Sequence, residues 1–202
     1  MTPAALALRP GVLVVLEGLD KTGKTTQREE LRSMLDPESV VFAHMPSGFV
    51  PFTTRVYDAL EADSEGPTSG LAQQLAHLAC HAESINHLVK AVGSKALVLD
   101  RWWWSTLAYG WFGGPVKESG LSERSFQDLI DTIWRPVTAS VIFVFLEPHQ
   151  PDGNENDGVA VGYRALVRQC GNVAVPVPSD TPERTHEFIV TTLLDRGLAV
   201  RI

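Results

Sequence analysis

Short apolar runs recur along this chain of 202 residues, each four to six residues long and separated by longer polar and amphipathic stretches. The runs are rich in β-branched residues and lack an alternation of apolar and polar positions. This is typical of strands buried on both faces of a parallel sheet. The predicted strands are Val12–Leu16, Val40–Ala43, Ala96–Leu99, Val141–Leu146 and Val173–Val177.

Between and after these runs, apolar residues return with the spacing of amphipathic helices. The predicted helices are Lys24–Leu35, Phe52–Leu60, Leu71–Val92, Glu123–Trp134, Val159–Cys170 and Pro182–Leu194. Asp180 or Thr181 before Pro182 is typical of a helix start. Alternation of this kind predicts an α/β fold with a parallel sheet. We see no internal repeat or low-complexity linker, and therefore expect one domain over residues 1–202.

Composition changes this picture little, since 44% of the residues are hydrophobic and 20% are charged. A formal net charge of -7 argues against a surface for duplex nucleic acid, although it leaves room for a local basic groove. Cys80 and Cys170 have neither metal-binding spacing nor a disulfide framework, which indicates free thiols in a reducing compartment. With no basic leader and no long apolar run, we expect a cytoplasmic protein without a membrane segment.

A glycine-rich turn follows the first predicted strand and opens the first predicted helix. Gly18 is followed after four residues by Gly23, Lys24 and Thr25, which is the spacing of a phosphate-binding loop. The glycines let backbone N–H groups close around phosphate oxygens, and the helix N-terminus adds a partial positive charge. Lys24 is placed to reach the terminal phosphates, and the Thr25 hydroxyl to bind Mg²⁺.

Two residues inside this loop are unusual. Asp20 cannot help to hold phosphates, but it can accept a hydrogen bond from a hydroxyl of a second substrate across the cleft. Lys21 can add positive charge near the transferred group. The alternative is that both side chains are solvated loop residues.

The sequence Asp100-Arg101 follows the third predicted strand, where ligands of such sheets bind. An acid at this position can hold Mg²⁺ directly or through water, and Arg101 can neutralise charge on a moving phosphoryl group. The alternative is a local ion pair. Of the tryptophans Trp102–Trp104, we expect one to wall the acceptor pocket and the others to pack in the core.

These two motifs together resemble thymidylate kinases. The resemblance covers nearly the whole chain and rests on the residues Leu19-Asp20, Thr26-Gln27, Asp100-Arg101, Ser105–Tyr109 and Arg135-Pro136. It implies a P-loop α/β/α sandwich with a five-stranded parallel sheet in the order 2-3-1-4-5. It also implies ATP and Mg²⁺ as co-substrates and transfer of the γ-phosphoryl group to an acceptor.

The resemblance also implies roles for individual residues. Asp20 would touch the acceptor sugar, Lys21 would stand for the basic loop residue of some members, and Arg101 would bridge the donor and acceptor phosphates. We expect Lys24, Arg101, Lys21 and Asp20 to be catalytic and Thr25 and Asp100 to bind Mg²⁺. The expected ATP-binding residues are Gly18, Thr22, Gly23, Lys24, Thr25 and Thr26. The expected acceptor-binding residues are Asp20, Pro46, Arg55, His77, His81, Arg101, Trp102 and Tyr109.

The chain departs from the family pattern after the second predicted strand. The family usually has an arginine there that helps to hold the acceptor phosphate, whereas this chain has His44-Met45-Pro46. Arg55 in the following helix is the nearest arginine.

A second departure lies in the long third helix, where the family places an aromatic residue that stacks on thymine and an arginine one turn later. His77 and His81 align with these positions and share one helical face. A base-contacting pair, a metal site and two partly exposed histidines without a site all fit this spacing.

A third departure is the lid, where the family has an arginine-bearing helix that closes over ATP. Here Glu147–Gly158 is polar, acidic and rich in turn residues, which indicates a short loop. Lys21, Arg164 and Arg168 are the candidates to supply the missing charge. A slow or nearly inactive enzyme also fits.

The leading prediction is an ATP-dependent kinase of dTMP or a related deoxynucleoside monophosphate. One alternative is a kinase of a modified-pyrimidine hydroxyl, such as 5-hydroxymethyluracil, free or in phage DNA. Only in that case is nucleic acid a partner. Another is a nucleotide-binding module without turnover. Members of the family commonly form dimers, and the sequence neither requires nor excludes a homodimer.

Overall fold

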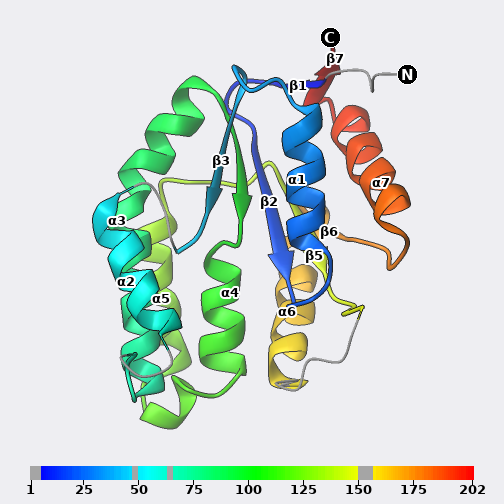
Figure 1. Cartoon of the computed structure of the whole chain (residues 1–202). Helices are drawn as coiled ribbons and strands as arrows, with labels where there is room; N and C mark the ends of the chain where they lie inside the picture. Colours follow the sequence, from blue (N-terminus) through cyan, green and yellow to red (C-terminus); the bar gives the residue numbers. More distant parts are fainter. Residues whose placement is uncertain (1–5, 47–49, 63–65, 150–156) are drawn as a thin grey trace.

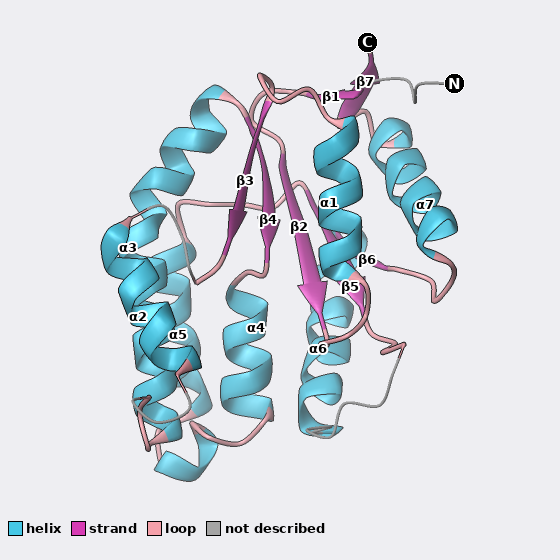
Figure 2. Ribbon diagram, viewed as in Figure 1, coloured by secondary structure: helices cyan, strands magenta, loops and turns pink. Residues whose placement is uncertain are grey.

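The apolar runs form one parallel sheet between two layers of helices in the computed structural model (Figures 1 and 2). The structure describes residues 6–46, 50–62, 66–149 and 157–202. The strands are β2 (Leu13–Gly18), β3 (Val40–His44), β4 (Ala96–Asp100), β5 (Val141–Phe145) and β6 (Ala174–Pro176). All of them start and end within two residues of the predicted runs, so the predicted α/β sandwich is confirmed.

The strand order is β3-β4-β2-β5-β6. A short strand, β1 (Leu6–Leu8), precedes the sheet in the sequence, and counting from β2 gives the predicted order 2-3-1-4-5. Leu16 of β2 is in register with Asp100 of β4 and with Phe143 of β5. The residues that follow β2 and β4 therefore emerge side by side at the carboxyl edge of the sheet, where the phosphate loop begins.

Alternate residues of each strand enter different apolar cores, which explains why the runs are unbroken. Leu13 and Val15 pack in one cluster with residues of α3 (Gly70–Ser94), α5 (Glu123–Trp134) and α6 (Asp157–Cys170). Val14 and Leu16 pack in a second cluster with Leu31 and with residues of α7. Burial on both faces requires apolar side chains at every position of a central strand.

The helices divide between these two faces. They are α1 (Lys24–Met34), α2 (Pro51–Glu61), α3 (Gly70–Ser94), α4 (Trp103–Leu107), α5 (Glu123–Trp134), α6 (Asp157–Cys170) and α7 (Pro182–Asp195). Helices α1 and α7 cover one face, while α3 to α6 cover the other and α2 packs on α3 (Figure 1). Thr181 caps α7, since its hydroxyl accepts a hydrogen bond from the Arg184 backbone N–H at 3.4 Å.

Two features were not predicted. Leu6–Leu8 pairs antiparallel with β7 (Ala199–Arg201), and these three-residue strands are too short to show a periodicity in the sequence. After β4 the chain forms α4 and then a π-helical turn over Ala108–Phe112, where we expected no helix. Wider turns of this kind are often found at functional sites.

Matched leucines on α3 test the assignment of its buried face. Leu88 is fully buried, whereas Leu75 is 43% exposed. We expect Leu88→Ala to lower the free energy of unfolding by about 2–5 kcal/mol, because it leaves a cavity in the core. Leu75→Ala should cost less than about 1 kcal/mol. Chemical denaturation of both variants measures the difference, and equal losses would contradict the assignment.

Candidate active site

The phosphate loop joins β2 to α1 and owes its shape to its glycines. Gly18 has a φ of 130°, and a Cβ there would lie 2.0 Å from the Phe145 carbonyl oxygen of β5. Gly23 has a φ of 87° immediately before the first residue of α1. Side chains are therefore excluded where the loop turns, and the N-terminus of α1 points its backbone N–H groups toward the loop.

Lys24 is buried inside this loop. Its ammonium group donates hydrogen bonds to the Leu19 carbonyl oxygen and, at 3.3 Å, to the Thr22 hydroxyl. Burial, followed by the charge of Arg101, lowers the pKa of Lys24 to about 8. Neutral oxygen atoms thus hold the ammonium at the loop. A polyphosphate bound in the loop would attract it more strongly than these oxygens do.

Glu17, the residue before Gly18, is fully buried and was not singled out in the sequence. Its carboxylate accepts hydrogen bonds from the Trp102 N–H at 2.7 Å, and from the Ser105 N–H at 3.0 Å and hydroxyl at 2.7 Å. The Tyr163 hydroxyl of α6 donates to it at 2.9 Å. Burial raises the pKa of Glu17, while the charge of Arg101 and the hydrogen bonds from Ser105 and Trp102 oppose the rise. Glu17 therefore acts as an N-terminal cap for α4, supplied from a neighbouring strand.

Arg101 stands between this capped helix and the phosphate loop. Its backbone has a φ of 65°, which a residue with a side chain adopts only when its surroundings hold it there. The guanidinium forms an ion pair with Asp20 and donates hydrogen bonds to the Ser105 hydroxyl at 3.0 Å and the Gly18 carbonyl oxygen at 3.4 Å. Arg101 is thereby fixed beside the phosphate loop.

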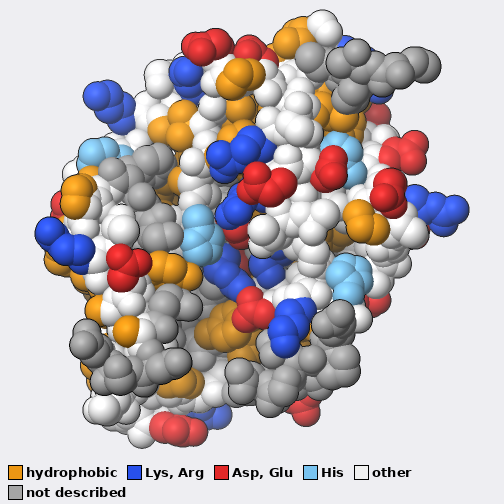
Figure 3. Space-filling view, in the orientation of Figure 1, with side chains coloured by type: hydrophobic (Ala, Val, Ile, Leu, Met, Phe, Trp, Pro, Cys, Tyr) orange, Lys and Arg blue, Asp and Glu red, His pale blue; other side chains and the backbone are white. Residues whose placement is uncertain are grey.

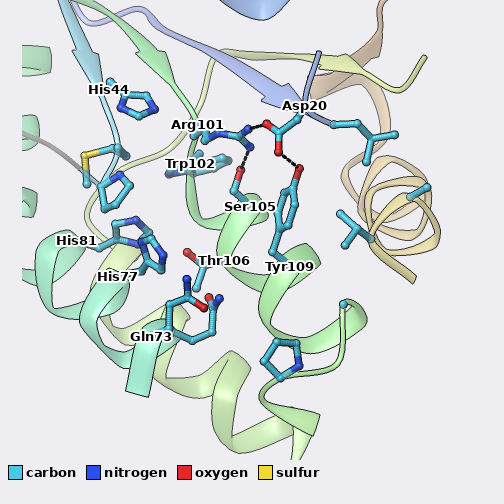
Figure 4. Close-up of a pocket in the computed structure, with 18 of the residues that line it drawn as sticks. Asp20, His44, Gln73, His77, His81, Arg101, Trp102, Ser105, Thr106 and Tyr109 are labelled. Carbon is cyan, nitrogen blue, oxygen red and sulfur yellow. Dashed lines mark hydrogen bonds and ion pairs between the residues drawn. The ribbon is translucent and has the colours of Figure 1, made fainter. Parts of the chain in front are cut away.

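Asp20 joins Arg101 to a third element. The Tyr109 hydroxyl, from the π-helical turn, donates to the second carboxylate oxygen of Asp20 at 3.0 Å (Figure 4). The Asp20 side chain is thus 47% exposed and at the same time bonded to both Arg101 and Tyr109. These three side chains come from three segments and meet at the entrance to a cleft.

The cleft has a volume of about 830 Å³ and lies beyond the carboxyl edge of the sheet. Figure 3 shows the face on which it opens, where basic, acidic and histidine side chains gather around a hollow. Sheet-side and loop residues line one side of it: Leu19, Asp20, His44, Met45, Pro46, Arg101, Trp102, Leu146 and Pro148. Helical residues and two residues of the chain after the π-helical turn line the rest: Tyr57, Gln73, Gln74, His77, His81, Ser105, Thr106, Tyr109, Gly113, Pro115, Asp157, Val159, Ala160 and Arg164.

His77 and His81 both line this cleft (Figure 4). His81 is 2% exposed, so the expectation of two partly exposed histidines is wrong for it. The Trp134 indole donates to His81 Nδ1 at 3.3 Å, which leaves the proton of the neutral ring on Nε2. Burial, followed by the charge of His77, lowers the pKa of His81 to about 3. Burial, followed by the charge of Arg101, lowers the pKa of His77 to about 4. Both imidazoles are neutral at pH 7.

The acid and the base of the Asp100-Arg101 sequence have different partners. Arg101 pairs with Asp20, whereas Asp100 accepts from Arg28 of α1 at 2.8 Å. The expectation of a local ion pair between neighbours is therefore wrong. Asp100 is 5% exposed at the end of β4, and Thr25 is exposed in the first turn of α1. Among the described residues no group of three or more His, Cys, Asp or Glu side chains is arranged to hold a metal, which leaves the histidine metal site without support.

A family model for thymidylate kinase matches residues 16–125, more than half of the chain. The chain belongs to the thymidylate kinase family. Members of this family are ATP-dependent kinases of small nucleotides, so the predicted enzyme class is confirmed.

Individual relatives agree with this assignment. A thymidylate kinase of Prochlorococcus marinus subsp. pastoris is 25% identical over 205 residues, which cover 91% of this chain and 95% of the relative. One of Hahella chejuensis is 30% identical over 126 residues, covering 60% of this chain and 58% of the relative. The crystal structure of the Ehrlichia chaffeensis thymidylate kinase shares the fold, with a TM-score of 0.74 at 21% identity over 92% of this chain and all of the other.

Within the thymidylate kinase family, the end of β3 is where we expect the chain to lack an acceptor-phosphate arginine. His44 is the last residue of β3, and it lines the cleft edge-on to Tyr57 of α2 at 5.8 Å between ring centroids. Arg55 is exposed on α2 and is not among the described residues that line the cleft. A contact between Arg55 and the acceptor stays a prediction that the geometry does not support.

The predicted lid region of this family member can be followed only at its two ends, because residues 150–156 lie outside the described residues. At the first end, the His149 N–H donates to the Lys21 carbonyl oxygen at 3.0 Å. At the other end, Arg164 of α6 lines the cleft, whereas Arg168 is exposed and is not among the cleft residues described. Arg164 is therefore better placed than Arg168 to supply the missing lid charge.

Several residues of the site were missed in the sequence. An acid at the end of an apolar strand was a usable signal for Glu17. Arg28 and Tyr163 gave no signal, because each bonds to a carboxylate distant in sequence. Gln74 gave none either, because its place on the cleft wall depends on how α3 packs. No helix among the described residues is long and apolar enough to span a membrane.

The neutral state of His81 predicts a pH dependence of stability. The unfolded chain binds a proton on His81 below pH 6.5, whereas the folded pKa is about 3, so stability falls as the pH drops between these values. The loss attributable to His81 is at most about 1.4 kcal/mol per pH unit. Urea unfolding from pH 7 to pH 4 should show a smaller loss for His81→Gln than for the wild type. His87→Gln, an exposed position on the same helix, is the control, and identical slopes in all three proteins would contradict the prediction.

Proposed function

We propose that this chain transfers the γ-phosphoryl group of ATP to the phosphate of dTMP. The observation that carries the proposal is the junction of Asp20, Arg101 and Tyr109 between the phosphate loop and the cleft. It offers a carboxylate to a sugar hydroxyl and a guanidinium to phosphate oxygens at one place. Phosphoryl transfer depends on such positioning and on neutralisation of charge.

The donor end of the site is the phosphate loop. Backbone N–H groups from Gly18 to Thr26 would surround the β- and γ-phosphates at the N-terminus of α1. Lys24 would exchange its contact with the Leu19 carbonyl oxygen for a phosphate oxygen, and the exposed Lys21 would add charge at the mouth of the loop.

The residues present fit Mg²⁺. Asp100 and Thr25 offer a carboxylate and a hydroxyl, the oxygen ligands that Mg²⁺ prefers, and phosphate oxygens and water complete such sites. When bound, the ion would neutralise charge on the phosphates. The Arg28 guanidinium already balances the charge of Asp100 at 2.8 Å, so Asp100 would hold the ion through water or exchange one partner for another.

At the acceptor end, Asp20 would accept a hydrogen bond from the sugar hydroxyl and Arg101 would lie between the two phosphates. Trp102 and Pro46 border the cleft beside them, and Tyr109 fixes the Asp20 carboxylate. The neutral His77 and His81 suit a neutral base rather than a second phosphate. The family match gives no support to a kinase of modified bases or to a module without turnover.

An acceptor panel tests the proposal. The protein is incubated with Mg·ATP and dTMP, dCMP, dUMP, 5-hydroxymethyl-dUMP or DNA containing 5-hydroxymethyluracil, and ADP release is measured. We expect release with dTMP at the highest kcat/KM of the panel. A higher kcat/KM for ADP release with the DNA than with dTMP, or no release with any acceptor, would overturn the proposal.

Loss of the Lys24 ammonium gives a sharper test of the donor site. Lys24→Ala should lower kcat with dTMP by about 10²–10³-fold or more, because one charge preorganised at the reacting phosphate is removed. Lys117→Ala, an exposed position outside the cleft, should retain wild-type turnover. Undiminished turnover of Lys24→Ala in the same coupled assay would remove the loop from the mechanism.

A further inference from the structure

Gln74 is a buried polar side chain whose amide is not used by the protein. It lies on α3, lines the cleft and is 6% exposed. Its buried Oε1 has no hydrogen-bond partner in the described part of the chain. Buried polar groups are paired in the great majority of cases, and an unpaired one costs about 1–3 kcal/mol. An unpaired amide on the wall of a cleft is therefore expected to have a partner in the ligand.

The backbone of Gly110 packs directly against this amide. A Cβ on Gly110 would lie 3.0 Å from Gln74 Oε1 and 3.1 Å from its Cδ, so the amide lies flat against a backbone that carries no side chain. Gly110 belongs to the π-helical turn, and its neighbour Tyr109 bonds to Asp20. The same turn thus positions the sugar-binding carboxylate on one side and leaves room for Gln74 on the other.

The surroundings of the amide are polar but uncharged. Thr106 is 5% exposed and lines the cleft, and His77 follows Gln74 by one turn on α3 (Figure 4 shows Thr106 and His77 near one another). Arg101, by contrast, is held at the phosphate loop by Asp20. The cleft therefore has a charged end suited to phosphates and a neutral end suited to the hydrogen-bonding edge of a base.

We propose that Gln74 is a specificity-determining residue that binds the edge of the acceptor base formed by N3 and the C4 substituent. For thymine, Oε1 accepts from the N3–H and Nε2 donates to O4. An amide carries one acceptor and one donor side by side, which complements this edge with two hydrogen bonds. The proposal rests on the proposed function, because it assumes that the acceptor is a pyrimidine nucleotide.

The test combines a change in the enzyme with a change in the base. Gln74→Leu removes both amide groups with little change in size, and the 5-methylpyrimidin-2-one deoxynucleotide removes O4 and the N3–H of thymine. We expect Gln74→Leu to lower kcat/KM for dTMP by about 10- to 100-fold with an unchanged KM for ATP. Gln127→Leu, a half-buried glutamine of α5 outside the cleft whose amide donates to Glu123 at 3.2 Å, should match the wild type.

The decisive quantity is the interaction between the two changes. The wild type should discriminate between dTMP and the pyrimidin-2-one by about 10- to 100-fold, and Gln74→Leu should lose most of that discrimination. Equal discrimination by both enzymes would overturn the proposal, even if Gln74→Leu is slower. If Gln74→Leu does not fold, Gly110→Ala is the second variant, because the added methyl group displaces the amide that packs against it and should shift the discrimination in the same direction.

Failure of the underlying function is recognisable separately. If the wild type phosphorylates none of these nucleotides, equilibrium binding of dTMP and of the pyrimidin-2-one is measured by calorimetry. If dTMP binds more tightly than the pyrimidin-2-one and Gln74→Leu abolishes this difference, the result would still support binding of the base by the Gln74 amide. Binding that does not differ between the two nucleotides would overturn it.

Discussion

The buried carboxylate of Glu17 is the interaction on which the geometry of the site depends. An isolated charge at this depth would cost several kcal/mol, and the protein offsets this with donors from the start of α4 and from α6. These donors include the N–H group directly after Arg101. The left-handed backbone of Arg101 is therefore held between the β-sheet register on one side and the Glu17 carboxylate on the other.

This arrangement separates two chemical environments in one cleft. Arg101, Lys24 and Asp20 form a network of charges at the phosphate loop. Gln74, His77 and His81 span about two turns of α3 and present hydrogen-bonding groups without charge to the cleft. The positive charge thus lies at the phosphate loop, where phosphoryl transfer needs it. Under the proposed function, recognition of the base would fall to neutral groups.

Much of this could be predicted from local sequence. Unbroken apolar runs identified all five strands of the sheet, and the spacing of Gly18 and Lys24 identified the loop. Both signals are local, since each depends only on residues that are adjacent in sequence. The pairing of Arg28 with Asp100, 72 positions apart, could not be foreseen, since it depends on the angle at which α1 crosses β4. The predicted role of Arg55 rests on proximity in sequence alone, since its exposed place on α2 gives that role no support.

The contact between Trp134 and His81 places a fluorescent side chain against a cleft histidine. All five tryptophans of the chain lie between positions 102 and 134, with Trp102 on the cleft wall and Trp134 bonded to a cleft histidine. The phosphate loop contains none. Under the proposed function, intrinsic fluorescence would therefore report the arrival of a ligand at this wall of the cleft without any label.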